Sequence, residues 1–227
     1  MAATATRSPA EGSGGAPPAR AYRFAGVFVL VLALCVFLIL APDTDWAHSI
    51  AIGLLSAALI VVVATSRASA AVRRARALAA LMGAVVLTLM VAFGVLGDVP
   101  LFVIATAMSL AIPLTLVGGL MRLIRTRGVT LQAVIGALTI YVLLGLVFSW
   151  LIGIVAHVGD QPFFSDGTDG TVSEHVYFSF TALTTTGFGD LAAGTQSGRA
   201  LVLIEMLSGQ LYLVTVIGVL IGSFGRR

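Results

Sequence analysis

Long apolar segments separated by short polar loops make up most of this chain. Six segments are long enough to cross a hydrocarbon layer of about 30 Å as α-helices. They are residues 24–41, 48–65, 77–96, 100–121, 130–156 and 198–223. The pattern predicts an all-α membrane protein with six transmembrane helices.

Composition excludes a soluble protein of this length. Of the 227 residues, 59% are hydrophobic and 10% are charged, and the mean hydropathy is +1.06. A soluble domain with so few charged side chains would expose a large apolar surface to water. The single cysteine, Cys35, lies inside an apolar segment, so no disulfide framework forms within one chain.

The reactive side chains show no arrangement that an enzyme requires. The sequence has no paired catalytic carboxylates, no Cys/His metal cluster, no nucleophile–base set and no phosphate-binding loop. Ser149 and His157 lie in one stretch but lack a third partner. We therefore expect a protein that is not an enzyme and that holds no cofactor.

The basic residues predict how the chain crosses the membrane. All thirteen are arginines, and twelve fall on one side of the membrane if both termini are cytoplasmic, with Arg199 as the exception. Because positive charge collects in cytoplasmic loops, this asymmetry predicts a multi-pass plasma-membrane protein with both termini inside. The spread of arginines over short loops also argues against a nucleic-acid partner. Residues 1–21 are interpreted as a disordered cytoplasmic tail, with a signal peptide as the rival interpretation of the N-terminal segment.

A different kind of segment lies between the fifth and sixth apolar stretches. Residues 157–170 are polar and rich in turn-forming residues. Thr171 and Glu174 then fit a helix-capping box, with Thr at the N-cap and Glu at the third helical position. The helix expected at 172–183 is too short to span a bilayer. We interpret it as a re-entrant half-helix, which directs the negative end of its dipole toward the membrane centre.

The half-helix is followed by a glycine-containing motif, Thr184-Thr185-Thr186-Gly187-Phe188-Gly189-Asp190. A dehydrated cation needs several oxygen ligands at once, and an ordinary extended chain points successive carbonyls to opposite sides. Turning them to one side requires backbone angles of alternating hand, which Gly187 and Gly189 adopt without steric cost. Thr185 can add its hydroxyl, and Asp190 adds negative charge at the outer mouth. The alternative interpretation of the motif is a simple turn between two helices.

From about Thr130 onward, the chain resembles the helix–pore-loop–helix module of prokaryotic potassium channels. The match runs without gaps through the motif, the pair Gly198-Arg199, and Gly209. The first four segments resemble six-span channels only in number. The resemblance implies a four-helix membrane domain without sensor arginines at 22–127 and a pore domain at 128–227. It also implies a selectivity filter formed by Thr185, Thr186, Gly187, Phe188 and Gly189, with potassium bound at the first four.

The same resemblance assigns residues around the filter. The tandem Tyr177-Phe178 resembles the aromatic cuff that braces the filter and hydrogen-bonds the outer aspartate, here Asp190. Gly209 falls at the usual gating hinge, and the family register turns Gln210 toward the cavity below the filter. Regular helical spacing adds further cavity-facing positions. They are Met206, Leu213, Val214 and Ile217.

Glu205 is the only acidic residue clearly inside a predicted span, which makes it a functional candidate by default. The five residues from Glu205 to Gln210 correspond to a rotation of about 500°, nearly opposite the cavity face. We expect Glu205 to point behind the filter and support it, toward hydroxyls such as Ser179, Thr181 or Thr184. In a shifted register four Glu205 side chains would line the cavity instead, and a purely structural acid is the third possibility.

Three departures from the family pattern qualify the expectation. Thr186 replaces the usual Val or Ile, so its hydroxyl needs a partner and potassium selectivity stays open. Phe188 replaces Tyr and removes one outward hydrogen bond. The sequence stops three residues after Phe224, so we expect no cytoplasmic ligand-binding domain.

These observations predict a passive potassium channel that assembles as a homotetramer in the lipid bilayer. We expect weak or absent voltage gating, because steep gating needs several charges within the membrane field. The alternatives are a weakly selective cation channel, a transporter related to such channels, and a non-conducting protein with a pore-like fold. A transporter of that type carries four pore loops in one chain, whereas this sequence has one.

Overall fold

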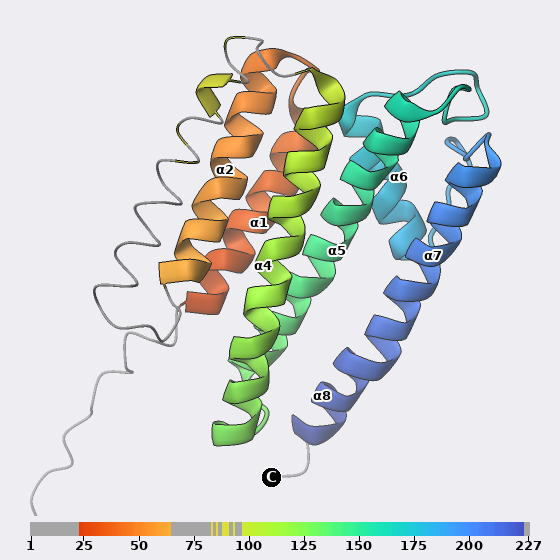
Figure 1. Ribbon diagram of the computed structural model, residues 1–227. Coiled ribbons are helices and arrows are strands. Elements are labelled where there is room, and N and C mark those ends of the chain that lie inside the picture. The colour runs from red at the N-terminus through yellow and green to blue at the C-terminus, as the bar shows by residue number, and fades with distance from the viewer. Residues whose placement is uncertain are drawn as a thin grey trace, which may run out of the picture.

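The computed structural model describes residues 23–64, 83, 85, 88–90, 93 and 97–224. The predicted tail at 1–21, the arginine-rich loop at 66–76 and most of the predicted span at 77–96 lie outside these residues. Within them the protein is a bundle of helices, so the all-helical prediction is confirmed there (Figure 1). The elements are α1 (Arg23–Leu40), α2 (Asp45–Ala64), α4 (Asp98–Arg127), α5 (Leu131–Val158), α6 (Val172–Leu183), α7 (Gln196–Tyr212), the π-helix η1 (Leu213–Ile217) and α8 (Gly218–Phe224).

Three of the described helical segments are long and apolar enough to cross a membrane. They are Asp98–Arg125, Leu131–Val158 and Gln196–Gly222. The third runs continuously through α7, η1 and α8. Two further apolar stretches, Ala25–Leu40 and Trp46–Val62, are shorter. Membrane-spanning helices are therefore supported, and the described residues show fewer full-length ones than the six that hydropathy predicted.

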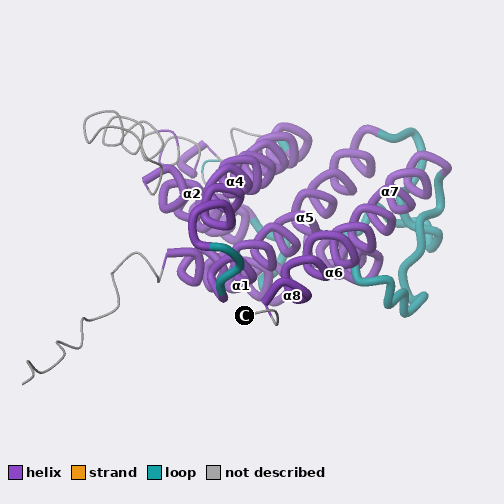
Figure 2. Tube along the Cα trace, turned by 90° about the horizontal axis from the view of Figure 1, so that it is seen from below, coloured by secondary structure: helices purple, strands orange, loops and turns teal. Residues whose placement is uncertain are grey.

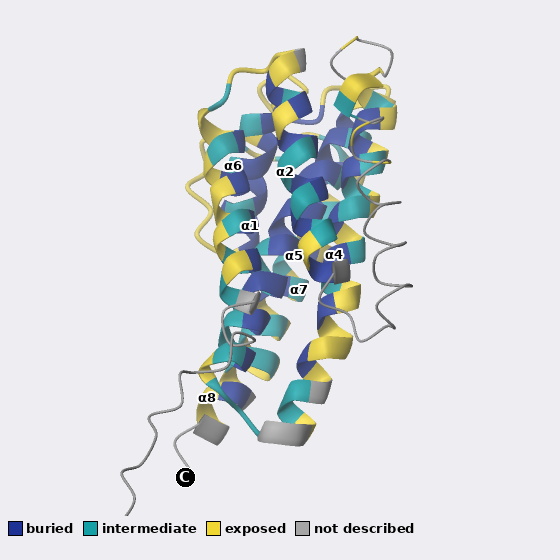
Figure 3. Ribbon diagram, turned by 90° about the vertical axis from the view of Figure 1, so that its left-hand side faces the viewer, coloured by how far each residue is buried: buried dark blue, intermediate teal, exposed yellow. Residues whose placement is uncertain are grey.

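Helix α5 lies at the centre of the bundle and packs against α1, α4, α6 and α7. Two glycines allow neighbouring side chains to approach its backbone closely. A Cβ at Gly145 would lie 2.9 Å from the Phe180 ring of α6, and one at Gly153 would lie 2.5 Å from the Phe102 ring of α4. Buried residues accordingly concentrate between these helices (Figure 3). In contrast, only 17% of an apolar 18-residue stretch within Gln196–Gly222 is buried, against 67% of the corresponding stretch within Leu131–Val158.

Local hydrogen bonds explain where α5, α6 and α7 begin. Thr130 caps α5 by accepting from the Ala133 N–H at 3.3 Å. The capping box predicted for α6 is confirmed: the Thr171 N–H donates to Glu174 Oε2 at 2.7 Å, and the Glu174 N–H donates to Thr171 Oγ1 at 3.3 Å. The helix covers Val172–Leu183, which equals the predicted range. Thr195 caps α7 in the same way through Gly198 N–H.

The chain leaves the bundle as loops before and after α6. These loops gather at the end of the molecule where α7 begins (teal in Figure 2). They also pair with each other, because the Ser165 N–H donates to Ala192 O at 2.8 Å and the Gly194 N–H donates to Phe163 O at 2.8 Å. The segment that follows the glycine-containing motif is therefore anchored to the loop that precedes α6.

Candidate ion-conduction site

The glycine-containing motif lies directly after α6 and has an unusual backbone. Positive φ angles occur at Thr185 (56°), Gly187 (51°) and Gly189 (83°). The intervening residues have negative φ, so the sign alternates along the motif. Alternation of this kind turns successive peptide groups to the same side. The alternating backbone expected from the two glycines is therefore present, and it begins two residues earlier, at Thr185.

Thr185 is the one described non-glycine residue with positive φ. A β-branched side chain disfavours this conformation, which costs on the order of 1–3 kcal/mol. Strain of this size persists only where surrounding contacts impose it. Here the Thr185 N–H donates to Ala182 O at 3.0 Å, which ties the residue to the last turn of α6.

The amide groups of the motif bond back to the half-helix. The Thr184 N–H donates to Phe180 O at 3.1 Å, and the Thr186 and Gly187 N–H groups both donate to Thr181 O, at 2.9 and 3.2 Å. The C-terminal carbonyls of α6, which a helix leaves without partners, are satisfied in this way. Thr181 therefore supports the motif through its backbone oxygen, while its hydroxyl donates to Phe178 O at 2.8 Å.

This arrangement leaves oxygen atoms available to a cation. Within the described part of the chain, no backbone hydrogen bond ends on a carbonyl oxygen of residues 185–189. The side chains of residues 184–190 are exposed in the single chain. Backbone carbonyls at this spacing are the ligands with which ion filters replace a hydration shell. Elsewhere in the described residues, no three His, Cys, Asp or Glu side chains come together as a metal site.

The hydroxyl of Thr186 has a partner. Thr184 Oγ1 donates to Phe180 O at 2.7 Å, and Thr186 Oγ1 lies 2.9 Å from Thr184 Oγ1. Because the Thr184 proton is already used, Thr186 is the donor in the second bond. Thr at position 186, in place of Val or Ile, therefore adds a hydrogen bond between two side chains of the motif. The Thr186 hydroxyl has the partner that the sequence analysis said it needs.

At the outer end, the tandem aromatic residues have separate contacts. Tyr177 donates its hydroxyl to Asp190 Oδ2 at 2.8 Å and stacks on Phe188, with ring centroids 6.2 Å apart and planes 5° apart. Phe178 instead packs edge-on against Phe164, with centroids 5.3 Å apart. Within one chain, Tyr177 is thus the residue that links α6 to both the aromatic and the acidic side chain of the motif.

The continuous segment formed by α7, η1 and α8, called the inner helix below, presents two faces. Glu205 and Gly209, four residues apart, are buried against the half-helix, whereas Gln210 on another face is exposed. Met206 is half-buried and packs in the apolar cluster that includes Phe178 and Val202. Glu205 therefore packs against α6, where it contacts Ser179, one of the three hydroxyls that the sequence indicated.

A π-helical turn at Leu213–Ile217 interrupts the inner helix. The sequence-based assignment of Leu213, Val214 and Ile217 to the face of Gln210 assumed regular α-helical spacing, and that assumption is wrong here. A π-turn accommodates one additional residue, which shifts the following side chains by about 100° around the axis. In the single chain Ile217 is partly buried and packs against the main apolar core, while Val214 is exposed.

Sequence analysis missed a contact below the motif. The Tyr141 hydroxyl of α5 donates to Leu183 O, the last carbonyl of α6, at 3.2 Å. A Cβ added at Gly209 would lie 2.5 Å from the same oxygen. Tyr141 also stacks on Tyr212, whose hydroxyl donates to Ala137 O at 2.8 Å. Neither tyrosine belongs to a recognisable sequence motif, so only the three-dimensional packing reveals these contacts.

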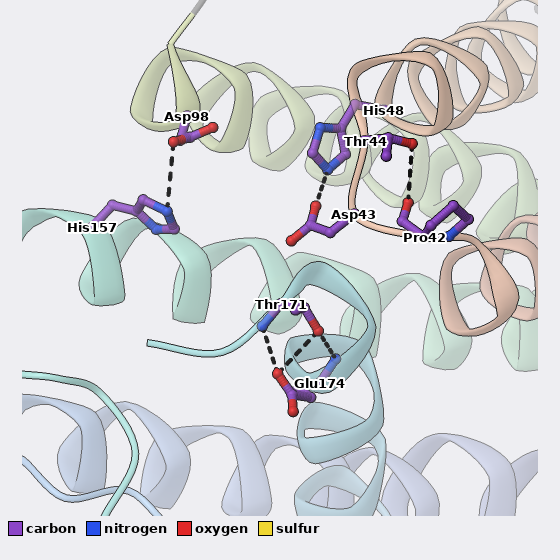
Figure 4. A network of polar contacts seen from close by, with 8 residues as sticks. All are labelled: Pro42, Asp43, Thr44, His48, Asp98, His157, Thr171 and Glu174. Carbon is purple, nitrogen blue, oxygen red and sulfur yellow. Dashed lines mark hydrogen bonds and ion pairs between the residues drawn. The ribbon is translucent and has the colours of Figure 1, made fainter. Parts of the chain in front are cut away.

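Further polar contacts lie where the α1–α2 connection approaches the start of α6 (Figure 4). His48 Nε2 lies 2.7 Å from Asp43 Oδ1 in the α1–α2 connection. This bond, reinforced by the Val172 backbone N–H, lowers the pKa of Asp43. The Ser173 hydroxyl donates to Ile39 O at 2.9 Å. A cavity of about 220 Å³ lies between these groups. The α1–α2 connection thus contacts the N-terminus of the half-helix directly.

Comparison with known proteins identifies the class to which this region belongs. Residues 136–225 match a family model described as "Ion channel". The matched range covers most of α5 and all of α6, the motif, α7, η1 and α8. This part of the chain is therefore an ion channel domain, and the resemblance expected from the sequence is confirmed for it. No curated protein and no solved structure matches the chain.

Proposed function

We propose that the chain forms a potassium-selective channel through which ions pass passively along the motif 184–190. The observation that carries this proposal is the alternation of φ from Thr185 to Gly189, with the amides bonded to α6. Carbonyl oxygens held on one side by this backbone suit a dehydrated monovalent cation.

Assembly as a homotetramer follows from the same geometry. One chain contributes one row of carbonyls, and a filter of this type surrounds the ion with four. The exposed face of the inner helix supports assembly, because it carries an apolar row that a single chain leaves uncovered. This row comprises Leu203, Ile204, Leu207, Leu211 and Val214. Lipid and neighbouring copies are its proposed partners, with Gln210 facing the cavity.

The proposed placement is a six-span protein of the plasma membrane with both termini cytoplasmic, based on the arginine asymmetry. We propose weak or absent voltage dependence, because the arginines of α4 at 122, 125 and 127 all lie in its last six residues. Charges at the edge of the membrane sense little of its field.

The test is ion flux through the purified full chain in liposomes. The reversal potential under opposed potassium and sodium gradients measures selectivity, and the particle mass in detergent measures assembly. Gly187→Ala and Gly189→Ala should each abolish current, because a side chain opposes positive φ. Gly222→Ala is the matched control, since no atom lies within 4 Å of its added Cβ and its φ is ordinary.

The outcomes separate the alternatives. Normal current in Gly187→Ala or Gly189→Ala would refute the filter assignment. A reversal potential that does not distinguish the two ions would favour the weakly selective cation channel. A stable tetramer without current would indicate a non-conducting pore.

A further inference from the structure

Glu205 is a buried carboxyl group that the proposed conduction path does not use. It lies in α7 and is completely buried. Neither of the two ion pairs described in the structure involves it, and both lie at the other end of the half-helix. An ionised carboxylate without a cationic partner is strongly disfavoured in such surroundings. Some interaction other than an ion pair must therefore stabilise the Glu205 carboxyl group in this position.

The contacts of Ser179 indicate whether the carboxyl group of Glu205 carries a proton. Its Oγ lies 2.7 Å from Gly145 O of α5 and makes a short contact with Glu205 Oε1. A serine hydroxyl has one proton, so it cannot donate to both oxygens. If Ser179 donates to Gly145 O, the second short contact requires a proton on Glu205. A neutral carboxyl satisfies both contacts at once, in the order Glu205 to Ser179 to Gly145.

These hydrogen bonds lie next to the residues that hold the proposed filter in place. Ser179 immediately precedes Phe180, Thr181 and Ala182, the residues whose carbonyls hold the amides of the motif. The bonds join α7, α6 and α5 at that level. Glu205 Oε2 has no partner among the described residues. A neutral carbonyl oxygen tolerates this at a lower cost than a carboxylate oxygen would.

We propose that Glu205 is a positioning residue, a neutral acid that donates to Ser179 and holds the half-helix against α7 and α5. It keeps the carbonyls of residues 180–182 in place for the filter amides. The part that concerns conduction rests on the proposed channel function, whereas the protonation and the clamp between helices do not.

The protonation is tested by infrared spectroscopy of the full chain at neutral pH. The carbonyl stretch of a protonated carboxyl should be present in the wild type and absent from Glu205→Gln. Glu174→Gln is the matched control, because Glu174 is exposed and glutamine preserves its capping box. In Ser179→Ala the band should persist and shift, since the acid loses its acceptor. A wild type without the band has an ionised Glu205, and the proposal is then wrong.

The positioning role is tested by comparing Glu205→Gln with Glu205→Leu. The glutamine amide still donates to Ser179, and leucine cannot. We expect the loss of current in low potassium to be about tenfold faster in Glu205→Leu and Ser179→Ala, and within about twofold of wild type in Glu205→Gln. Equal rates in Glu205→Leu and wild type, or equally fast loss in Glu205→Gln and Glu205→Leu, would overturn the role.

Failure of the channel function itself gives a different result. If the wild type carries no current, the thermal stability of the same variants in detergent still measures the clamp. The clamp is supported if the wild type and Glu205→Gln unfold at higher temperatures than Glu205→Leu and Ser179→Ala. It is rejected if the unfolding temperatures do not follow this order.

Discussion

The contact between Gly209 and the end of the half-helix allows a sharp test, the substitution Gly209→Ala. A Cβ at this position would lie 2.5 Å from Leu183 O and 2.7 Å from Leu183 Cδ1, where ordinary contacts begin at 3.4 Å. The oxygen cannot easily move away. It accepts a hydrogen bond from Tyr141, and the motif begins at the next residue.

The expected cost follows from overpacking of a tightly packed site. Insertion of a methyl group that displaces backbone costs about 1–3 kcal/mol. The intrinsic helix preference acts in the opposite direction, because alanine is favoured over glycine by up to about 1 kcal/mol in a helix. The sign of the measured change therefore decides which effect dominates. A net loss indicates that glycine is required for close approach of α7 to α6.

The assay is thermal unfolding of the purified protein in detergent, together with potassium current in liposomes. Gly209→Ala should lower the unfolding temperature and reduce current. Gly222→Ala should leave the unfolding temperature unchanged or slightly raised, because its added methyl group meets no atom within 4 Å. If Gly209→Ala is as stable as Gly222→Ala and only its gating changes, the close-approach argument is refuted. The hinge role expected from the sequence would then explain the glycine.

Two further predictions concern side-chain contacts. The hydrogen bond with His48 lowers the pKa of Asp43 below its ordinary 3.8, so its contribution to the free energy of unfolding is complete above that pH. This contribution is lost as the pH falls through the lowered value, and in acid-unfolding curves Asp43→Asn should remove that dependence. Thr186→Val removes the hydroxyl that donates to Thr184 and should preserve current with a small change in selectivity, measured as a reversal potential. Complete loss of current in this variant would show that the hydroxyl is essential.

The sequence by itself determined the local elements of the ion channel domain. Apolar length and composition predicted helices and a membrane environment, because a bilayer requires long apolar segments with internally satisfied backbone. The capping box predicted the start of α6 at Val172, since its bonds are local. The two glycines of the motif predicted alternating backbone angles, which follow from the absence of a side chain. All of these features depend on residues close together in the chain.

Contacts between distant segments were decided only by the tertiary structure. Ser179 and Glu205, or Tyr141 and Leu183, meet because α5, α6 and α7 pack at particular heights and rotations. The π-turn after Tyr212 shows the same limit, since the regular α-helical spacing assumed from Gln210 onward does not hold through it. Helix rotation and register depend on the sum of many packing contacts along α5 and α6. Spacing within a single helix therefore cannot determine them.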